Sequence, residues 1–229
     1  ESIFENVKHI IKKEKIFITG DSRFNQIVER FEENKDTQYL PDYFSYTQNI
    51  IFGSYDGNDE PIIIQSLLRC FPKGEQSLIE KKQRIILVPH ETDNKTINGM
   101  INKLQKLSFN INKYTTLSKN NNQSNIIIVD KVGILADIYK YAQLAYIGAG
   151  FGQGVHSVIE PVVHGCITSF GPNIELLDEA KYLFSNQLGY MILNINDMCK
   201  FIELDIHNNK NVIIRDKMQE YILNNKNAS

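Results

Sequence analysis

Short, fully apolar runs that alternate with helical patterns restrict this chain to few folds. Residues 85–88 (Ile-Ile-Leu-Val) and 126–129 (Ile-Ile-Ile-Val) contain no polar side chain. A strand with one face in water alternates apolar and polar residues, so strands that are apolar throughout are typical of a parallel sheet covered on both faces. The alternation of such strands with helices predicts a doubly wound α/β domain.

The same patterns give the expected order of elements. Strands are expected at residues 15–19, 49–53, 84–88, 110–114, 125–129, 144–148, 167–170 and 190–193. Helices are expected near residues 21–31, 59–70, 94–107, 133–141, 156–164, 174–186, 196–205 and 210–224. One low-complexity patch, residues 119–125, is interpreted as a loop because it is rich in Asn.

Length, charge and cysteine usage exclude several classes of protein. The 229 residues suffice for one large domain or two small ones. A net charge of -2 gives no positive field that would attract nucleic acid or an anionic membrane, so we expect no nucleic-acid partner. The apolar runs fall far short of the about 20 residues that span a bilayer. The three distant cysteines are interpreted as reduced thiols, and we expect no metal site.

In a doubly wound sheet, ligands bind outside the carboxyl ends of the strands, so the residues that follow each strand are site candidates. Arg23 follows the first expected strand and Ser54 the second. Pro89, His90 and Glu91 follow the third. Each segment also has a simpler interpretation: a helix cap beside a solvated arginine, a turn, and a His–Glu pair on the surface.

Two further candidates are the segment after the fifth strand and the residue that follows the seventh. Asp130, Val132 and Gly133 lie where the backbone either presents N–H and C=O groups to a planar base or serves a turn only. Asn173, after Gly171-Pro172, either caps the next helix or contacts a ligand.

The strongest local signal is a glycine-rich loop after the sixth strand. Residues 148–154 (Gly-Ala-Gly-Phe-Gly-Gln-Gly) hold four glycines in seven positions. Glycine lets the backbone approach a ligand closely, and a helix start that follows such a loop attracts an anion. The loop therefore predicts a phosphate site. It is neither a P-loop nor a GxGxxG fingerprint at a first strand. The residues expected around the phosphate are Gly152, Gly154, Val155, His156 and Ser157.

Glu160 is expected one helical turn beyond this start. A carboxylate there can accept hydrogen bonds from the two vicinal hydroxyls of a ribose. The simpler interpretation is a first-turn glutamate that is favoured by the helix dipole.

Together these residues resemble the 3-deoxy-D-manno-octulosonic acid (Kdo) transferases, which are bacterial GT-B glycosyltransferases of lipopolysaccharide synthesis. The similar stretches are residues 130–139, 145–156, 160–161, 170–173 and 179–180. Upstream, residues 20–25, 53–54 and 89–91 fall in the family's order, so the resemblance spans about residues 16–189.

The resemblance implies that residues 1–229 are a single C-terminal, Rossmann-like donor-binding domain of a GT-B enzyme. CMP-Kdo is the implied donor. A lipid A precursor is the implied acceptor, and a separate N-terminal domain binds it and supplies the catalytic base. No catalytic residue and no cofactor is therefore expected in this chain. Because the chain begins with Glu1 instead of Met, we expect a piece of a longer protein that works at the cytoplasmic face of the bacterial inner membrane.

The family's motifs also imply roles for single residues. Glu160 is implied to hold the cytidine ribose, and residues 154–157 at the helix start to hold the phosphate. Pro89 and His90, together with residues 130–133, are implied to border the cytosine. Ser54 and Arg23 are implied to lie near the phosphate or carboxylate of the donor.

Three positions depart from the family's pattern. Ser157 replaces a frequent Asn, and Ala149 stands where a third glycine is frequent. His90 follows Pro89 directly, so an arginine expected near the phosphate is missing.

Two alternatives stay open from the sequence. The first is another GT-B enzyme that uses a UDP-sugar, since the fold and the ribose contact would be the same. The second is a non-catalytic α/β interaction module in which the glycine loop is only a turn.

Overall fold

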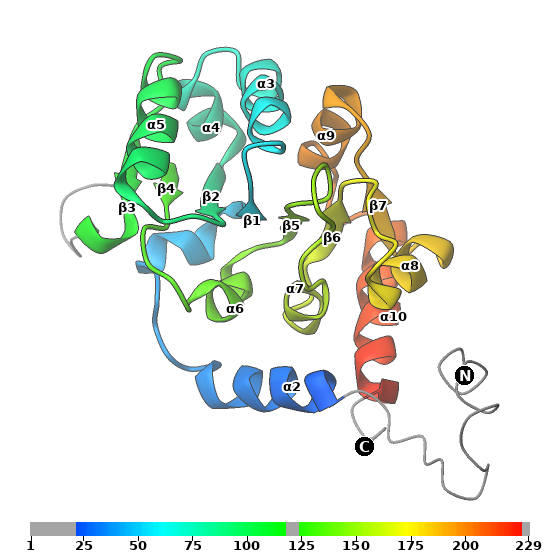
Figure 1. Ribbon diagram of the computed structural model, residues 1–229. Helices are drawn as coiled ribbons and strands as arrows, with labels where there is room; N and C mark the ends of the chain where they lie inside the picture. The colour runs from blue at the N-terminus through cyan, green and yellow to red at the C-terminus, as the bar shows by residue number, and fades with distance from the viewer. Residues whose placement is uncertain (1–21, 118–123, 226–229) are drawn as a thin grey trace, which may run out of the picture.

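The computed structural model describes residues 22–117 and 124–225, which form a seven-stranded sheet in the order β3-β4-β2-β1-β5-β6-β7 (Figure 1). Every strand pairing is parallel. The strands are β1 (Gln48–Tyr55), β2 (Gln83–Pro89), β3 (Ile111–Lys113), β4 (Ile126–Ile128), β5 (Leu144–Ile147), β6 (Ile167–Phe170) and β7 (Gly189–Met191). The prediction of a doubly wound parallel α/β fold is confirmed. The strand expected at 15–19 and most of the loop expected at 119–125 lie outside the described residues.

Helices connect the strands and cover both faces of the sheet. The α-helices are α2 (Ser22–Asn34), α3 (Glu60–Cys70), α4 (Glu75–Lys81), α5 (Asn94–Gln105), α6 (Leu135–Ile138), α7 (Ile159–Val163), α8 (Asp178–Ser185), α9 (Ile195–Ile202) and α10 (Asn209–Asn225). Short 3-10 helices are η2 (Asp42–Tyr46), η3 (Tyr114–Thr116) and η4 (Tyr139–Tyr141).

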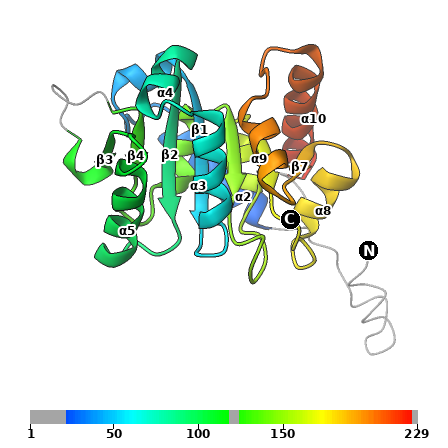
Figure 2. The same cartoon turned by 90° about the horizontal axis from the view of Figure 1, so that it is seen from above.

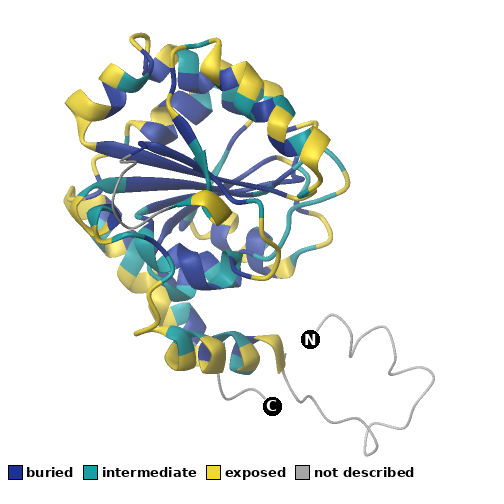
Figure 3. Ribbon diagram, turned by 90° about the vertical axis from the view of Figure 1, so that its left-hand side faces the viewer, coloured by how far each residue is buried: buried dark blue, intermediate teal, exposed yellow. Residues whose placement is uncertain are grey.

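Successive residues of the central strands feed two separate cores. Ile50 and Phe52 of β1 pack with residues of α3, α5 and α9, whereas Ile51 packs with residues of α6, α7 and α10. Figure 2 shows α3 and α9 in front of the sheet, and Figure 3 shows the buried strands between two layers of helices whose outer faces are exposed. Burial on both faces explains why the strands are apolar throughout.

The side on which successive strands are added to the sheet changes at β1, in the middle of the sheet. After β1 the chain adds β2, β3 and β4 on one side, and β5 then returns to the other side of β1. The carboxyl ends of β1 and β5 thus meet at the topological switch point, which is where open α/β sheets bind ligands.

Three expected helices differ from the structure. The helix expected from residue 156 begins at Ile159, because the N–H groups of Val155 and His156 donate to carbonyls of neighbouring loops. The helix expected over residues 174–186 begins at Asp178. The helix expected over residues 133–141 is divided into α6 and η4. Helix α4, between Gly74 and Lys82, was not predicted.

Two sequence expectations can be compared with the described residues. Cys70, Cys166 and Cys199 are free and buried. Among the helices of the described ranges, none combines the length and apolar character that crossing a membrane requires.

Candidate functional site

The glycine loop lies where the exits of three strands cross. A Cβ on Gly148 would lie 2.3 Å from the Cα of Tyr55, which ends β1. A Cβ on Gly150 would lie 2.6 Å from the Cα of Gly171, which follows β6. These contacts leave no room for a side chain, so the two glycines are required by backbone packing. A Cβ on Gly152 would lie 2.7 Å from the side-chain amide of Asn58. A Cβ on Gly154, whose φ is 129°, would meet no atom of the described chain beyond its sequence neighbours closer than 3.8 Å, so Gly154 remains a candidate for close approach to a ligand.

Asp59 ties this loop to the β1 exit. Its carboxylate accepts hydrogen bonds from the Ala149 N–H (2.7 Å), the Tyr146 hydroxyl (2.6 Å) and the Asp56 N–H (2.9 Å). Burial raises the pKa of Asp59, and these hydrogen bonds oppose that shift. Asp59 occupies the N-cap position of α3, but its side chain makes no capping hydrogen bond there.

Asn173 holds the other side of the loop. Its N–H donates to the Gly150 carbonyl (3.0 Å), its carbonyl accepts from the Val155 N–H (3.1 Å), and its amide Nδ2 donates to the Gly152 carbonyl (2.9 Å). The helix-cap interpretation is wrong, because α8 begins only at Asp178, with Leu177 as its N-cap. The loop is thus a hydrogen-bonded structure fixed at both ends.

Two histidines meet beside the loop. The rings of His90, after β2, and His156 stack with centroids 4.8 Å apart and an angle of 16° between planes. The His90 N–H donates to the Tyr55 carbonyl (2.9 Å), which fixes this segment to β1. Glu91 is exposed beside His90, with its Oε1 3.9 Å from His90 Nε2. Burial, and then the His90 ring, lower the pKa of His156.

The expected phosphate-binding helix start is corrected. Gly154 to Ser157 precede α7, which has five residues, and Glu160 is its second residue instead of lying a full turn inside. Within the described ranges, the N–H groups of Ser157 and Val158 donate to no protein acceptor. They are donors that a ligand at this edge can use.

Glu160, on α7, lies beside residues of α2 and α6. It lines a cavity of about 20 Å³ with Arg30, Asp137 and His164, among others. Burial raises the pKa of Glu160, whereas Arg30 lowers it. Helix α2 packs on α6 and α7 from outside, which brings Arg30 to this place (Figure 1).

Arg30 joins Glu160's surroundings to the expected base-binding segment. Its guanidinium donates to both carboxylate oxygens of Asp137 (2.9 and 2.8 Å) and to the Gly133 carbonyl (2.7 Å). The sequence analysis missed Arg30 and Asp137, since no spacing or motif links a residue of α2 to one of α6.

The remaining candidates occupy varied environments. Asp130 accepts hydrogen bonds from the Thr115 N–H (3.0 Å) and hydroxyl (2.6 Å), so its side chain holds η3. Val132 is 72% exposed. Ser54 has a φ of 51° at an irregularity of β1, and Pro89 is buried at the end of β2. Arg23 forms an ion pair with the buried carboxylate of Glu179 on α8.

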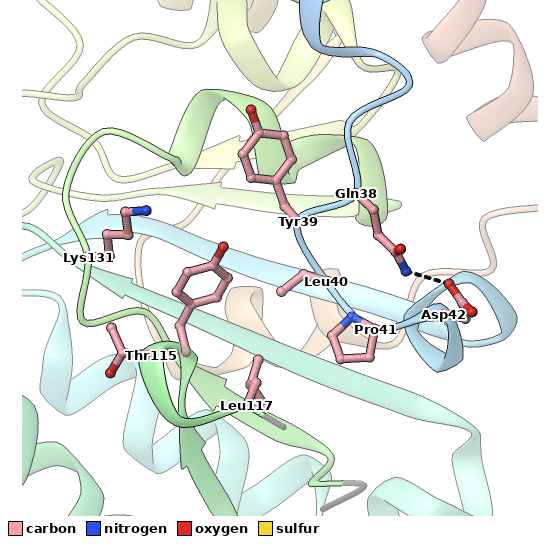
Figure 4. Close-up of a pocket in the computed structure, with 9 residues that line it drawn as sticks. Gln38, Tyr39, Leu40, Pro41, Asp42, Thr115, Leu117 and Lys131 are labelled. Carbon is pink, nitrogen blue, oxygen red and sulfur yellow. Dashed lines mark hydrogen bonds between the residues drawn. The ribbon is translucent and has the colours of Figure 1, made fainter. Parts of the chain in front are cut away.

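A cavity beside η2 and η3 does not coincide with these residues. It measures about 580 Å³ and includes Tyr39, Tyr114, Thr115 and Lys131 in its lining (Figure 4). Lys131 is the one residue of the segment after β4 in its lining, which contains neither His90 nor His156 nor Glu160. The switch-point edge is therefore the candidate site. In the part of the chain that the structure describes, no group of three or more His, Cys, Asp or Glu residues is arranged to hold a metal.

The sheet order and the glycine loop at its switch point define a Rossmann-like domain. The chain is 25% identical to a bifunctional glycosyltransferase/methyltransferase of Fusobacterium nucleatum over 205 residues, 87% of this chain and 30% of that protein. It is 26% identical to a Kdo transferase of Chlamydophila psittaci over 172 residues, 72% of this chain and 36% of that protein.

A solved structure has the same fold. The C-terminal CMP-Kdo binding domain of WaaA from Acinetobacter baumannii matches with a TM-score of 0.65 at 14% identity, over 87% of this chain and 97% of that domain. No protein-family model matches the sequence. The chain spans about a third of the length of the two curated relatives. The resemblance to Kdo transferases and the GT-B fold are thereby confirmed.

Proposed function

We propose that this chain is the donor-binding domain of a glycosyltransferase that transfers Kdo from CMP-Kdo to a lipid A precursor in lipopolysaccharide biosynthesis. The observation that carries the proposal is the convergence of the family-like segments on one edge. His90 and the continuous segment 148–160 come from separate parts of the chain, and the crossing of the exits of β1, β5 and β6 brings them to the switch point.

Each segment has a distinct task in this proposal. The N–H groups of Ser157 and Val158 donate to the donor's phosphate, and Glu160 accepts hydrogen bonds from the ribose hydroxyls. The backbone of residues 130–133 and Pro89 border the cytosine. Arg30 favours the ionised form of Glu160, which is the form that accepts two hydrogen bonds.

The chemistry divides between two domains. A base of the acceptor domain removes the proton of the acceptor hydroxyl, which attacks the anomeric carbon of Kdo as CMP leaves. This chain positions CMP and stabilises the phosphate charge through preorganised N–H donors. It therefore binds donor nucleotide and does not turn over by itself. The full-length protein meets its lipid acceptor at the cytoplasmic face of the inner membrane.

Calorimetric titration of the chain with CMP, 2′-deoxy-CMP, UMP and UDP tests the proposal. CMP should bind most tightly, and loss of one ribose hydroxyl should weaken binding about 10- to 150-fold, because a hydrogen bond to a charged group contributes about 1.5–3 kcal/mol. Glu160→Ala should abolish the difference between CMP and 2′-deoxy-CMP. Glu33→Ala, an exposed change on α2, is the matched control and should keep it.

The titration also separates the alternatives. Preference for UDP would indicate another GT-B enzyme. Absence of binding by every nucleotide would favour the non-catalytic interaction module.

A further inference from the structure

The charges that act on the stacked histidines come from acidic side chains and from the rings themselves. The charged groups that act on His156 are Asp56 and Asp59, both from the segment after β1, and the titratable ring of His90. His90 itself faces His156 and Glu91. Among the described residues, no lysine or arginine is one of the groups that shift the pKa of His156.

Imidazole is the side chain that can supply a positive charge here near neutral pH. Asp56 and Asp59 favour a proton on His156, while its burial opposes protonation. Two parallel rings 4.8 Å apart repel each other when both are charged, so a second proton is disfavoured. A bound anion next to the rings favours the state in which one of the two rings is protonated.

On the basis of the proposed function, we propose that the His90–His156 pair takes up one proton from solvent when the donor's phosphate binds, and so acts as a proton-linked phosphate clamp. The pair thereby adds positive charge only when the ligand is present. The proposal concerns the phosphate and not the base, so it predicts no proton uptake with cytidine.

The direction of the pH dependence follows from linkage. In the free chain the pKa of His156 is lowered, so its ring is neutral near pH 7. The bound phosphate raises that pKa. Affinity therefore increases as the pH falls through the bound-state pKa, by at most about tenfold per pH unit. It levels off below the free-state pKa, where both states carry the proton.

The probe must not titrate by itself. The phosphate of CMP has a second pKa of about 6, which would mimic uptake by the protein. The methyl ester of CMP carries one fixed charge and resembles the phosphodiester of a sugar donor. Titrations of the full chain with this ester near pH 7 in PIPES and in Tris, whose ionisation heats differ, give the number of protons taken up.

The expected result is uptake of most of one proton by the wild type with the ester and of none with cytidine. His156→Gln and His90→Asn should each reduce the proton uptake and weaken binding of the ester, and His156→Gln should leave cytidine binding unchanged. Retained cytidine binding shows that His156→Gln is folded, and an unchanged far-UV circular dichroism spectrum shows the same for His90→Asn. His207→Asn changes an exposed histidine in the loop before α10 and should leave both quantities unchanged.

Two results would overturn the inference while leaving the proposed function intact. One is equal binding heat of the ester in both buffers. The other is undiminished uptake in the His90→Asn/His156→Gln double variant. If neither cytidine nor the ester bound, the proposed function would fail and this inference with it.

Discussion

Two regions next to helix α7 are stabilised by different interactions. In the first, the glycine loop is fixed by backbone crossings at Gly148 and Gly150 and by hydrogen bonds to Asp59 and Asn173. In the second, Glu160 lies in a small cavity with Arg30 and its partner Asp137. The first region requires small residues and fixed strand positions. The second requires the positive charge of Arg30, which helix α2 supplies.

The difference shows how one site combines rigidity with adjustable charge. Steric crossings fix where the loop lies, irrespective of pH. The carboxylates and histidines around α7 titrate, so their contributions change with pH and with a bound ligand. Breaking each region separately should thus give effects of different size and different pH dependence.

The largest effect is expected from Gly150→Ala. A Cβ there would lie 2.6 Å from the backbone of Gly171, so one strand exit must move. We expect a loss of about 3 kcal/mol in the free energy of unfolding, measured by urea titration. The matched control is Gly99→Ala in α5, which meets no atom within 4 Å. It should stabilise the chain by about 0.5–1 kcal/mol. Equal effects of the two changes would contradict the close backbone contact between Gly150 and Gly171.

A smaller effect is expected from Arg30→Met. It leaves the Asp137 carboxylate, whose side chain is 6% exposed, without its partner. Because the guanidinium is 44% exposed, we expect a cost of about 2 kcal/mol instead of the 3–5 kcal/mol of a fully buried pair. The control Lys35→Met breaks an exposed pair with Glu32 and should cost less than about 0.5 kcal/mol.

The pH dependence of this variant provides a second check. Arg30 lowers the pKa of Asp137 in the folded chain below 3.8. The stabilisation is therefore present above that value and is lost as the pH falls through the folded-state pKa. Wild type and variant should converge in acid. A difference that persisted there would show that Arg30 acts by packing alone.

The smallest effect is expected from Ala149→Gly. Ala149 has a φ of 66°, a left-handed conformation that costs a non-glycine residue about 1–2 kcal/mol. Glycine relieves this cost but loses a buried methyl group and gains unfolded-state entropy. We expect a net change within about 0.5 kcal/mol of zero in thermal or urea unfolding. Ala145→Gly in β5 has no strain to relieve and should cost about 1.5 kcal/mol. Similar losses in the free energy of unfolding at both positions would contradict backbone strain at Ala149.

The sequence predicted the central strands well because their burial on both faces leaves a local signature. The runs at 85–88 and 126–129 can hardly be anything other than buried strands. The predicted start of α7 was wrong. The N–H groups of Val155 and His156 donate hydrogen bonds to the carbonyls of Asn173 and Gly148, which hold these two residues outside the helix. No local pattern encodes such partners.

The candidate site was predictable in the same uneven way. The glycine spacing identified the loop, but which glycines serve packing depends on Tyr55 and Gly171, which lie elsewhere in the chain. Arg30 and Asp137 are 107 positions apart and meet only because α2 packs on α6 and α7. The pairing of His90 with His156 likewise requires the completed sheet.

The tie between Asp59 and Ala149 joins positions 90 residues apart and has a consequence for how the domain folds. Closing so long a loop is entropically costly, and it becomes favourable only after both halves of the sheet have docked. The ligand edge should therefore be among the last features to form. A nucleotide bound there would stabilise the completely folded chain alone, and slow hydrogen exchange at the Ala149 amide would report global unfolding instead of local opening.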